Sequence, residues 1–327
     1  MILVTGASGF VGQHLVRLLS GKGHTVRALY NSTAPDAALQ ALPGVSWMQC
    51  DLLDIFEIEE AMQDVEEIYH CAGMVSFNPR DKEAMLHFNA ESTANIVNQA
   101  LEQGIRKMVY VSSVAALGRS DDGKPVTEAE EWEENKHSSA YGMSKYQAEM
   151  EVWRGMAEGI SAVVINPVTI LGEATHWDKG SARLAKVVHG EFPFYTEGIT
   201  GWVDVQDVAT IAYLLMQSDI EAERYIVSAG NYAFKDIFTR MAGAMSRRPP
   251  HIKANSFMTG LVWRWNYIRN LLTGKEITVT KETAATAQRK THYDNSKLLQ
   301  ALPGFSYTPI DTTIQRMADA YLASLKK

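Results

Sequence analysis

The amino-terminal residues 1–12 read MILVTGASGFVG. The apolar run Ile2–Thr5 predicts a buried strand, and a helical pattern starts a few residues later. Gly6, Gly9 and Gly12 lie between them at the spacing G-x-x-G-x-x-G. Glycines there permit a tight turn, let the backbone approach a pyrophosphate and allow close packing of helix on strand. Since a helix N-terminus offers unpaired N–H groups to phosphate oxygens, the stretch predicts a dinucleotide-binding loop.

Short β-rich runs alternate with helical patterns as far as about residue 170. We expect strands at 2–5, 25–29, 46–49, 67–71, 107–112 and 161–165, and helices at 11–20, 55–63, 82–103 and 141–157. This alternation is typical of βαβ units with helices on both faces of a parallel sheet. The strands are apolar on both faces, as a buried parallel sheet requires. The sequence therefore predicts an α/β fold, a doubly wound parallel sheet of the Rossmann type, with a smaller mixed α/β substrate-binding domain.

The predicted domain organisation follows from where this rhythm loosens. We expect residues 1–171 to form the NAD(P)-binding domain, with 201–229 packing back on it through a helix at 205–216 and a strand at 224–228. Residues 172–200 and 230–327 would form the substrate-binding region. An aromatic stripe at 262–272 is expected to pack against the domain or line a substrate cleft rather than lie on a membrane.

Composition excludes several classes of function. The 31 Lys and Arg residues against 38 Asp and Glu give a net charge of −7, which argues against a nucleic-acid-binding protein. We see no secretory signal and no apolar segment long enough to span a membrane. The cysteines, Cys50 and Cys71, lack companions at metal-ligand spacing. We expect a cytoplasmic protein with a small-molecule substrate, no metal, no nucleic acid and no membrane.

The cofactor preference is read from the end of the second predicted strand. There an acidic residue would bind the ribose 2′-hydroxyl of NAD. Here the strand runs into Tyr30, Asn31 and Ser32, with neither an acid nor an arginine at its end. Because a carboxylate would repel a 2′-phosphate, its absence slightly favours NADP(H) over NAD(H).

Tyr141 and Lys145 open a predicted helix at the spacing i, i+4, which places both side chains on one face. A nearby ammonium favours the phenolate and would lower the pKa of the tyrosine, making it a usable acid–base group. Ser113 ends a predicted strand, at the edge of the sheet where ligands bind in doubly wound folds. The three residues predict a catalytic set in which Ser113 orients the reacting oxygen.

These features resemble the extended short-chain dehydrogenase/reductase superfamily, which includes the NAD-dependent epimerase/dehydratase family. Further carriers of the resemblance are residues 50–52, 69–73, 87–93, 166–167 and 201–209. Within the superfamily the chain is most similar to dihydroflavonol-4-reductase-like and 3β-hydroxysteroid-dehydrogenase-like members, through residues 165–172, 201–209, 224–228 and 293–297. It lacks both the arginine near Asn31 of the former and the acid near Tyr30 of the latter. Leu117 stands where many sugar-nucleotide epimerases have tyrosine, which argues against that subgroup.

The resemblance implies roles for particular residues. Asn89 would support the proton relay as a fourth catalytic residue. Cofactor contacts would come from Gly6, Ser8, Gly9, Phe10, Val11, Gly12, Tyr30, Asn31, Ser32, Asp51, Leu52, Cys71, Ala72, Gly73, Ser112, Lys145, Pro167 and Val168. Substrate contacts are expected from Phe77, Val114, Met143, Asn166 and Trp202, and the aromatic side chains among them, with Trp177, Phe192, Phe194 and Tyr195, suggest an apolar pocket. A homodimer would form through the helices 82–103 and 141–157.

Three functions are compatible with this pattern. The first is interconversion of a carbonyl and a secondary alcohol by hydride transfer, with Tyr141 exchanging the proton. The second is a nucleotide-sugar epimerase or dehydratase with bound NAD, which would need cations for a diphosphate; candidates are Arg183, Arg240, Arg247, Arg264 and Arg269. The third is a non-catalytic dinucleotide-binding regulatory protein, against which the intact Ser113, Tyr141 and Lys145 argue.

Overall fold

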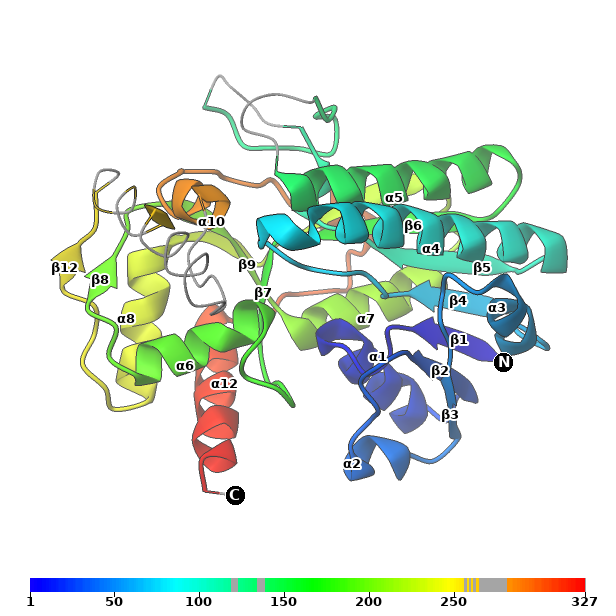
Figure 1. Cartoon of the computed structure of the whole chain (residues 1–327), viewed down its shortest axis with the longest axis horizontal. Coiled ribbons are helices and arrows are strands. Elements are labelled where there is room, and N and C mark those ends of the chain that lie inside the picture. Colours follow the sequence, from blue (N-terminus) through cyan, green and yellow to red (C-terminus); the bar gives the residue numbers. More distant parts are fainter. Residues whose placement is uncertain are drawn as a thin grey trace.

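A seven-stranded parallel sheet organises the amino-terminal part of the chain (Figure 1). The computed structural model describes residues 1–118, 123–133, 139–255, 258, 260, 263–264 and 281–326. The strand order is β10-β6-β5-β4-β1-β2-β3, and every neighbouring pair is parallel. The strands are β1 (Ile2–Thr5), β2 (Val26–Tyr30), β3 (Val45–Gln49), β4 (Glu67–His70), β5 (Lys107–Val111), β6 (Ala162–Pro167) and β10 (Glu223–Val227). The predicted α/β fold class is confirmed, and each predicted strand is present within two residues of its expected ends.

Helices cover both faces of this sheet. Successive residues of a strand point to opposite faces, so Ile2 and Val4 pack with helices α1 (Phe10–Gly21) and α7 (Val205–Met216), whereas Leu3 packs on the other side. That second core lies under α3 (Ile55–Ala61), α4 (Lys82–Gln103) and α5 (Ala140–Ala157). The short α2 (Ala37–Gln40) follows β2. Because both faces are covered, the strands need apolar residues throughout.

The order of the strands creates a crevice between β1 and β4. From β1 the chain passes to β2 and β3 on one side, then crosses to β4 on the other side of β1. The chain therefore leaves the carboxyl ends of two neighbouring strands in opposite directions. In open α/β sheets, ligands bind at the carboxyl ends of such a pair of strands. The glycine-rich loop after β1 and residues 71–73 after β4 therefore flank the same crevice.

A third core lies beyond the sheet, around two smaller sheets. One has the order β11 (Gly230–Ala233), β9 (Ile199–Asp204), β7 (Thr169–Leu171) and mixes parallel and antiparallel pairs; the other pairs β8 (Phe194–Tyr195) with β12 (Ile252–Lys253). Helices α6 (Arg183–His189), α8 (Phe234–Ala244) and α12 (Ile310–Ser324) pack in this core. Of the other described helices of this part of the chain, α10 (Lys281–Thr286) precedes α11 (Ser296–Ala301), which packs beside β10 of the large sheet. This confirms a smaller mixed α/β region, while the expected boundary at residue 171 remains a prediction.

Several elements here were not expected from the sequence. The segment 172–201 shows no clear period, yet it contains α6, β8 and the start of β9. Apart from Trp263 and Arg264, the aromatic stripe at 262–272 lies outside the described residues. No helix within the described ranges is long and apolar enough to cross a membrane.

Asp204 joins the carboxyl-terminal helix to the end of β9. Its side chain is fully buried, and it caps α7 by accepting from the backbone N–H of Gln206 at 2.7 Å. The same carboxylate accepts from the hydroxyl of Thr313 at 2.6 Å and pairs with Arg316, both on α12. Three interactions therefore meet on one buried charge.

We predict that Asp204→Asn lowers the free energy of unfolding by about 2 kcal/mol, because hydrogen bonds to a buried charge are lost or weakened. Urea denaturation measures this. Asp311→Asn is the matched control, since Asp311 also pairs with an arginine but is 74% exposed; it should cost less than about 1 kcal/mol. Equal costs for the two variants would contradict this account of Asp204.

Candidate active site

The glycine-rich loop is shaped by close backbone contacts. Gly6 has φ of 60°, and a Cβ placed on it would lie 2.8 Å from the backbone of Ala72. A Cβ on Gly12 would lie 2.2 Å from the carbonyl oxygen of Gly6. Gly9 is the N-cap of α1, and no side chain within the described part of the chain caps that helix. The first-turn N–H groups are therefore available to phosphate oxygens, and the loop fits a dinucleotide.

The adenosine end of the predicted cofactor site lies at the ends of β2 and β3. Tyr30 is half-buried, with its ring 6.5 Å from that of Trp47, while Asn31 and Ser32 are exposed. Arg27 donates to the carbonyls of Ala61 and Gln63 at 2.8 Å, so its guanidinium is already engaged. After β3, Leu52 is buried and Asp51 exposed. Small polar groups thus surround the position where a 2′-phosphate would be accepted or refused.

Lys145 is buried at the carboxyl edge of the sheet. Its Nζ donates to the hydroxyl of Tyr110 and to the carbonyl of Val111, both at 3.0 Å. A Cβ on Gly73 would lie 3.5 Å from this Nζ and 3.6 Å from Oδ1 of Asn89. At these distances a Cβ would make only ordinary van der Waals contacts, so the loop after β4 lies beside the lysine without a steric requirement for glycine at this point.

Tyr141 meets Ser113 across the gap between α5 and β5. A hydrogen bond from Ser113 lowers the pKa of the Tyr141 phenol, but burial has the larger effect and raises it. Burial also lowers the pKa of Lys145 to about 8. The expected lowering of the Tyr141 pKa by Lys145 is not seen here, because the ammonium is directed at Tyr110 and Val111. The spacing i, i+4 predicts that Tyr141 and Lys145 lie on one face of α5, but it does not predict the direction of the Lys145 ammonium.

Asn89 braces the loop after β4. Its Nδ2 donates to the carbonyl of Met74 at 3.0 Å and to Ser144 Oγ at 2.9 Å, and its Oδ1 accepts from the N–H of Met74 at 2.6 Å. Ser144 in turn donates to the carbonyl of Tyr141 at 2.8 Å. Asn89 thus connects the loop to the start of α5, while its part in a proton relay remains a prediction.

Three of the five expected substrate residues are accessible. Phe77 is 39% exposed and packs edge-on against Tyr141, with ring centroids 5.8 Å apart; Val114 and Met143 are half-buried. The expectation for Asn166 and Trp202 needs correction, because both are fully buried. Asn166 lies on β6, between β10 and β5, and bonds to Glu149 and to the carbonyl of Ser113.

Trp202 belongs to the third core rather than to a ligand surface. Its Nε1 donates to the carbonyl of Tyr232 at 3.0 Å, and its ring meets that of Phe234 at 5.4 Å. Trp177, also expected in the pocket, packs against Tyr321 at 5.2 Å in the same core. Aromatic residues alone could not separate pocket from core, since both environments favour them.

Two further residues of the site were not anticipated. His70 ends β4, is fully buried, and has its pKa lowered to about 3 by burial and by Lys145, so the ring is neutral at physiological pH. It bonds to Thr5 at 2.7 Å and Thr93 at 3.1 Å. Ser112 donates to Glu149, the second of these residues, at 2.6 Å, and its expected contact with the cofactor remains a prediction. Glu149 follows Lys145 by four residues, so the helical spacing held a signal for it.

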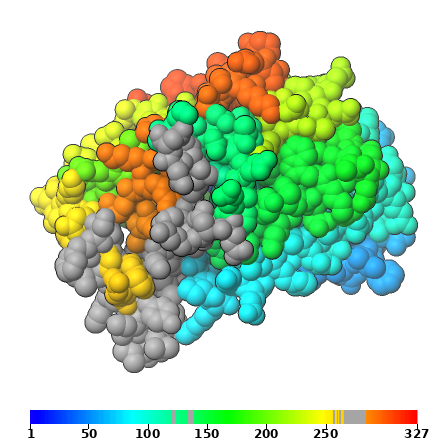
Figure 2. Space-filling model, turned by 90° about the horizontal axis from the view of Figure 1, so that it is seen from above, coloured from blue at the N-terminus to red at the C-terminus, as the bar shows by residue number. Residues whose placement is uncertain are grey.

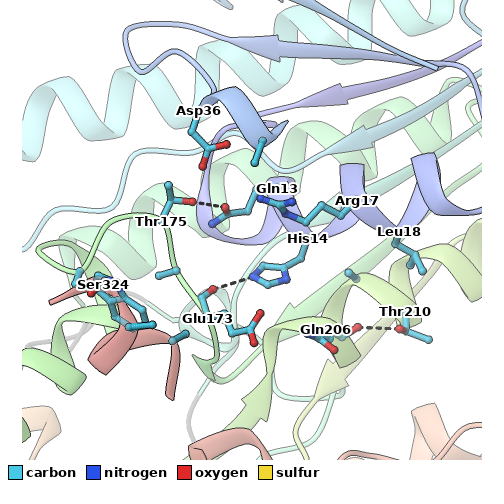
Figure 3. Close-up of a pocket in the computed structure, with 16 residues that line it drawn as sticks. Gln13, His14, Arg17, Leu18, Asp36, Glu173, Thr175, Gln206, Thr210 and Ser324 are labelled. Carbon is cyan, nitrogen blue, oxygen red and sulfur yellow. Dashed lines mark hydrogen bonds between the residues drawn. The ribbon is translucent and has the colours of Figure 1, made fainter. Parts of the chain in front are cut away.

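A separate cavity of about 840 Å³ lies between α1, residues 173–177, α7 and α12 (Figure 3). Gln13, His14 and Arg17 line it from α1, and Gln206 and Thr210 from α7. None of the catalytic residues expected from the sequence lines it. The cavity is therefore distinct from the space around Tyr141.

Comparisons with known proteins agree with this geometry. Residues 2–228 match the NAD dependent epimerase/dehydratase family. A putative dihydroflavonol 4-reductase of Synechocystis sp. is 30% identical over 97% of this chain and 92% of its own length. Cinnamoyl-CoA reductase 1 of Petunia hybrida is 28% identical over 89% and 93%. The crystal structure of gox2253 superposes with a TM-score of 0.82 at 29% identity, covering 99% and 98% of the two chains.

The protein belongs to the NAD-dependent epimerase/dehydratase family, in the extended short-chain dehydrogenase/reductase superfamily. Within it, the chain is an NAD(P)-dependent reductase of the dihydroflavonol reductase and cinnamoyl-CoA reductase type. Its cofactor is therefore a nicotinamide dinucleotide.

We predict that Gly12→Ala abolishes the rise in thermal midpoint that a dinucleotide causes, because the added methyl would push α1 away from the Gly6 carbonyl. Differential scanning fluorimetry with and without dinucleotide tests this. Gly21→Ala is the control at the other end of α1, where a Cβ would meet nothing within 4 Å; it should keep the full response. An undiminished response in Gly12→Ala would show that this contact does not shape the site.

Proposed function

We propose that the protein interconverts a carbonyl and a secondary alcohol on a small, hydrophobic substrate, with Tyr141 as the acid/base. The observation that carries this proposal is that Ser113 lies within reach of the Tyr141 phenol, while the buried Lys145 lies one turn further along α5. The pair lies at the carboxyl edge of the sheet, as does the glycine-rich loop. The names of the relatives, a dihydroflavonol reductase and a cinnamoyl-CoA reductase, support a carbonyl substrate.

The residues divide the proton chemistry between them. The dinucleotide would supply or accept the hydride. Tyr141 would give its proton to the substrate oxygen during reduction, or take one from the alcohol during oxidation. Ser113 would donate a hydrogen bond to the same oxygen and hold it beside the phenol. The Lys145 ammonium would stabilise negative charge on Tyr141 as the proton leaves, once it turns from Tyr110 towards the phenol.

The approach to Tyr141 supports a hydrophobic substrate. Phe77 covers one edge of the tyrosine ring, and Val75, in the same loop, is 57% exposed. Met143 is half-buried one turn into α5. Exposed apolar side chains beside a polar reacting group are the usual composition of a small-molecule site.

For the cofactor, we propose a preference for NADP(H) over NAD(H). Exposed Asn31 and Ser32 can donate hydrogen bonds to a 2′-phosphate, and the sequence places no carboxylate at the end of β2 to repel it. Arg27 is held by two carbonyls and does not contribute to the preference in this arrangement.

The epimerase reading is weaker for this chain. Two of its candidate diphosphate cations already have partners: Arg240 pairs with Asp311 at 2.9 Å, and Arg247 contacts His189 at 2.8 Å. Arg264 stacks on Trp263, and Arg269 lies outside the described residues. A purely regulatory role would leave the Tyr141–Ser113 pair and the buried lysine without a purpose.

We further propose that the protein is a homodimer and that it is located in the cytoplasm. Figure 2 shows α4 (cyan) and α5 (green) lying together along one face of the molecule. This is the pair of helices through which we expect two copies to associate.

We predict that NADP⁺ and NADPH raise the thermal midpoint more than NAD⁺ and NADH do. A ligand that binds only the folded protein stabilises it by about 2.7 kcal/mol at a hundredfold excess over its dissociation constant. Each dinucleotide is added separately in differential scanning fluorimetry. Equal shifts, or larger shifts with NAD⁺ and NADH, would overturn the proposed preference.

We also predict that Tyr141→Phe lowers kcat by about 10²-fold or more, because the acid/base group is removed, while dinucleotide binding stays unchanged. The assay follows the absorbance of the reduced nicotinamide with a panel of aromatic and aliphatic ketones, which are the carbonyl compounds that give a secondary alcohol. Tyr146→Phe is the matched control: Tyr146 lies on the same helix but stacks on Trp132 at 4.6 Å. Full turnover by Tyr141→Phe would refute the mechanism.

A further inference from the structure

Glu149 is a fully buried carboxylate that the proposed reaction does not yet use. Its Oε2 accepts from Ser112 Oγ at 2.6 Å and from Asn166 Nδ2 at 2.9 Å. Its Oε1 accepts from Trp153 Nε1 and from the guanidinium of Arg224, both at 3.3 Å. Four donors, one of them a cation, converge on this side chain from one helix and three strands or their ends, which is an arrangement for holding a charged carboxylate.

The Oε2 side of this cluster leads directly to Ser113. The amide of Asn166 donates both to Glu149 and to the carbonyl of Ser113, at 3.1 Å. Its Oδ1 is buried with no partner among the described residues. Turning the amide over would place that oxygen against a carboxylate and a carbonyl, so Glu149 and Ser113 together determine its orientation. Ser112, the other donor, is the neighbour of Ser113 in the chain.

The Oε1 side of Glu149 contacts β10, the edge strand of the large sheet, through Arg224. Arg224, on β10, pairs with Glu149 and also donates to the carbonyls of Glu128 at 2.9 Å and Glu130 at 3.3 Å. The arginine is therefore held by the segment that follows β5 as well as by α5. Glu149 cannot shift without disturbing these contacts.

Glu149 also faces Lys145, one turn earlier on α5, and its charge favours the ammonium. The titratable groups around Lys145 are His70 and Cys71 from the end of β4, Tyr110 from β5, and Tyr141 and Glu149 from α5. Burial keeps His70 neutral, with a pKa of about 3, and raises the pKa of Cys71 to about 12. Burial likewise raises the pKa values of Tyr110 and Tyr141. Among these groups, Glu149 is the anion.

We propose that Glu149 is a positioning residue of the proposed reaction, with two effects from one carboxylate. It fixes the Ser112–Ser113 turn through Ser112 and Asn166, so that the Ser113 hydroxyl stays on Tyr141. It also supplies the buried negative charge that faces Lys145. The inference rests on the proposed function for its kinetic consequences, but its effect on Lys145 can be measured without a substrate.

The substrate-free test compares Glu149→Gln with wild type by NMR of ¹³Cε-labelled lysine across a pH titration, the Lys145 signal being assigned by its loss in Lys145→Met. Lysine is cationic below its pKa, and removing a facing anion disfavours the cation. The midpoint should therefore fall from about 8 by about one pH unit. Glu151→Gln, which removes a partly exposed acid paired with Arg154 on the same helix, should leave it unchanged. An unchanged midpoint in Glu149→Gln would overturn the electrostatic effect, whether or not a substrate has been found.

The kinetic test uses the carbonyl substrate identified by the panel. Glu149→Gln should lower kcat about tenfold or more with KM and dinucleotide affinity within about twofold, and the loss of activity at high pH should begin at a lower pH than in wild type. A residue that only supports packing would lower activity without changing the pH at which activity begins to fall on the alkaline side.

If Glu149→Gln does not fold, Glu149→Asp replaces it. The shorter side chain keeps the negative charge but moves the carboxylate away from Ser112 and Asn166. Its Lys145 midpoint should then stay near wild type while kcat falls, and a wild-type kcat would refute the positioning effect.

Discussion

The close approach of two backbones at Gly6 and Ala72 is the constraint on which the site depends. It occurs where the chain leaves β1 towards one side of the sheet and leaves β4 towards the other. A side chain on Gly6 or Gly12 would hold the loops and α1 apart. Because the contact is made of backbone, it leaves the first-turn N–H groups of α1 facing the crevice without a side chain over them. The loop after β4 also places Gly73 beside Lys145, so the proposed cofactor loop lies next to the face of α5 that carries this lysine.

Around that crevice the protein buries polar groups and gives them defined partners. Asn89 is committed to Met74 and Ser144, and His70 to two threonines. Such partners hold the loop after β4 and the start of α5 in place before any ligand arrives. Buried groups with satisfied hydrogen bonds reorganise little, which favours a preorganised site. Tyr141, Ser113 and Phe77 are more accessible than these groups, in keeping with the proposed contacts to a substrate.

Local pattern was enough where an element is long, is apolar throughout or has a strict backbone requirement. The strands of the large sheet, both long helices α4 and α5, and the glycine-rich loop were all predicted from residues within a few positions of one another. The elements within the segment 172–201 could not be predicted from local pattern, because α6 has only seven residues and β8 only two. Short elements carry too few residues for a period to emerge, and contacts with α8 and α12 stabilise them instead.

The sequence by itself therefore determined the fold class, and it was enough to propose the dinucleotide loop and the set Tyr141, Lys145 and Ser113, since these depend on spacing along the chain. Only the tertiary structure decided what each side chain faces. It turned Lys145 towards Tyr110, enclosed Trp202 in a core, and gathered Glu149, Asn166 and Arg224 from three separate segments. The physical reason is that burial and hydrogen bonding are set by neighbours in space, and Arg224 and Glu149, for example, lie 75 residues apart in the chain.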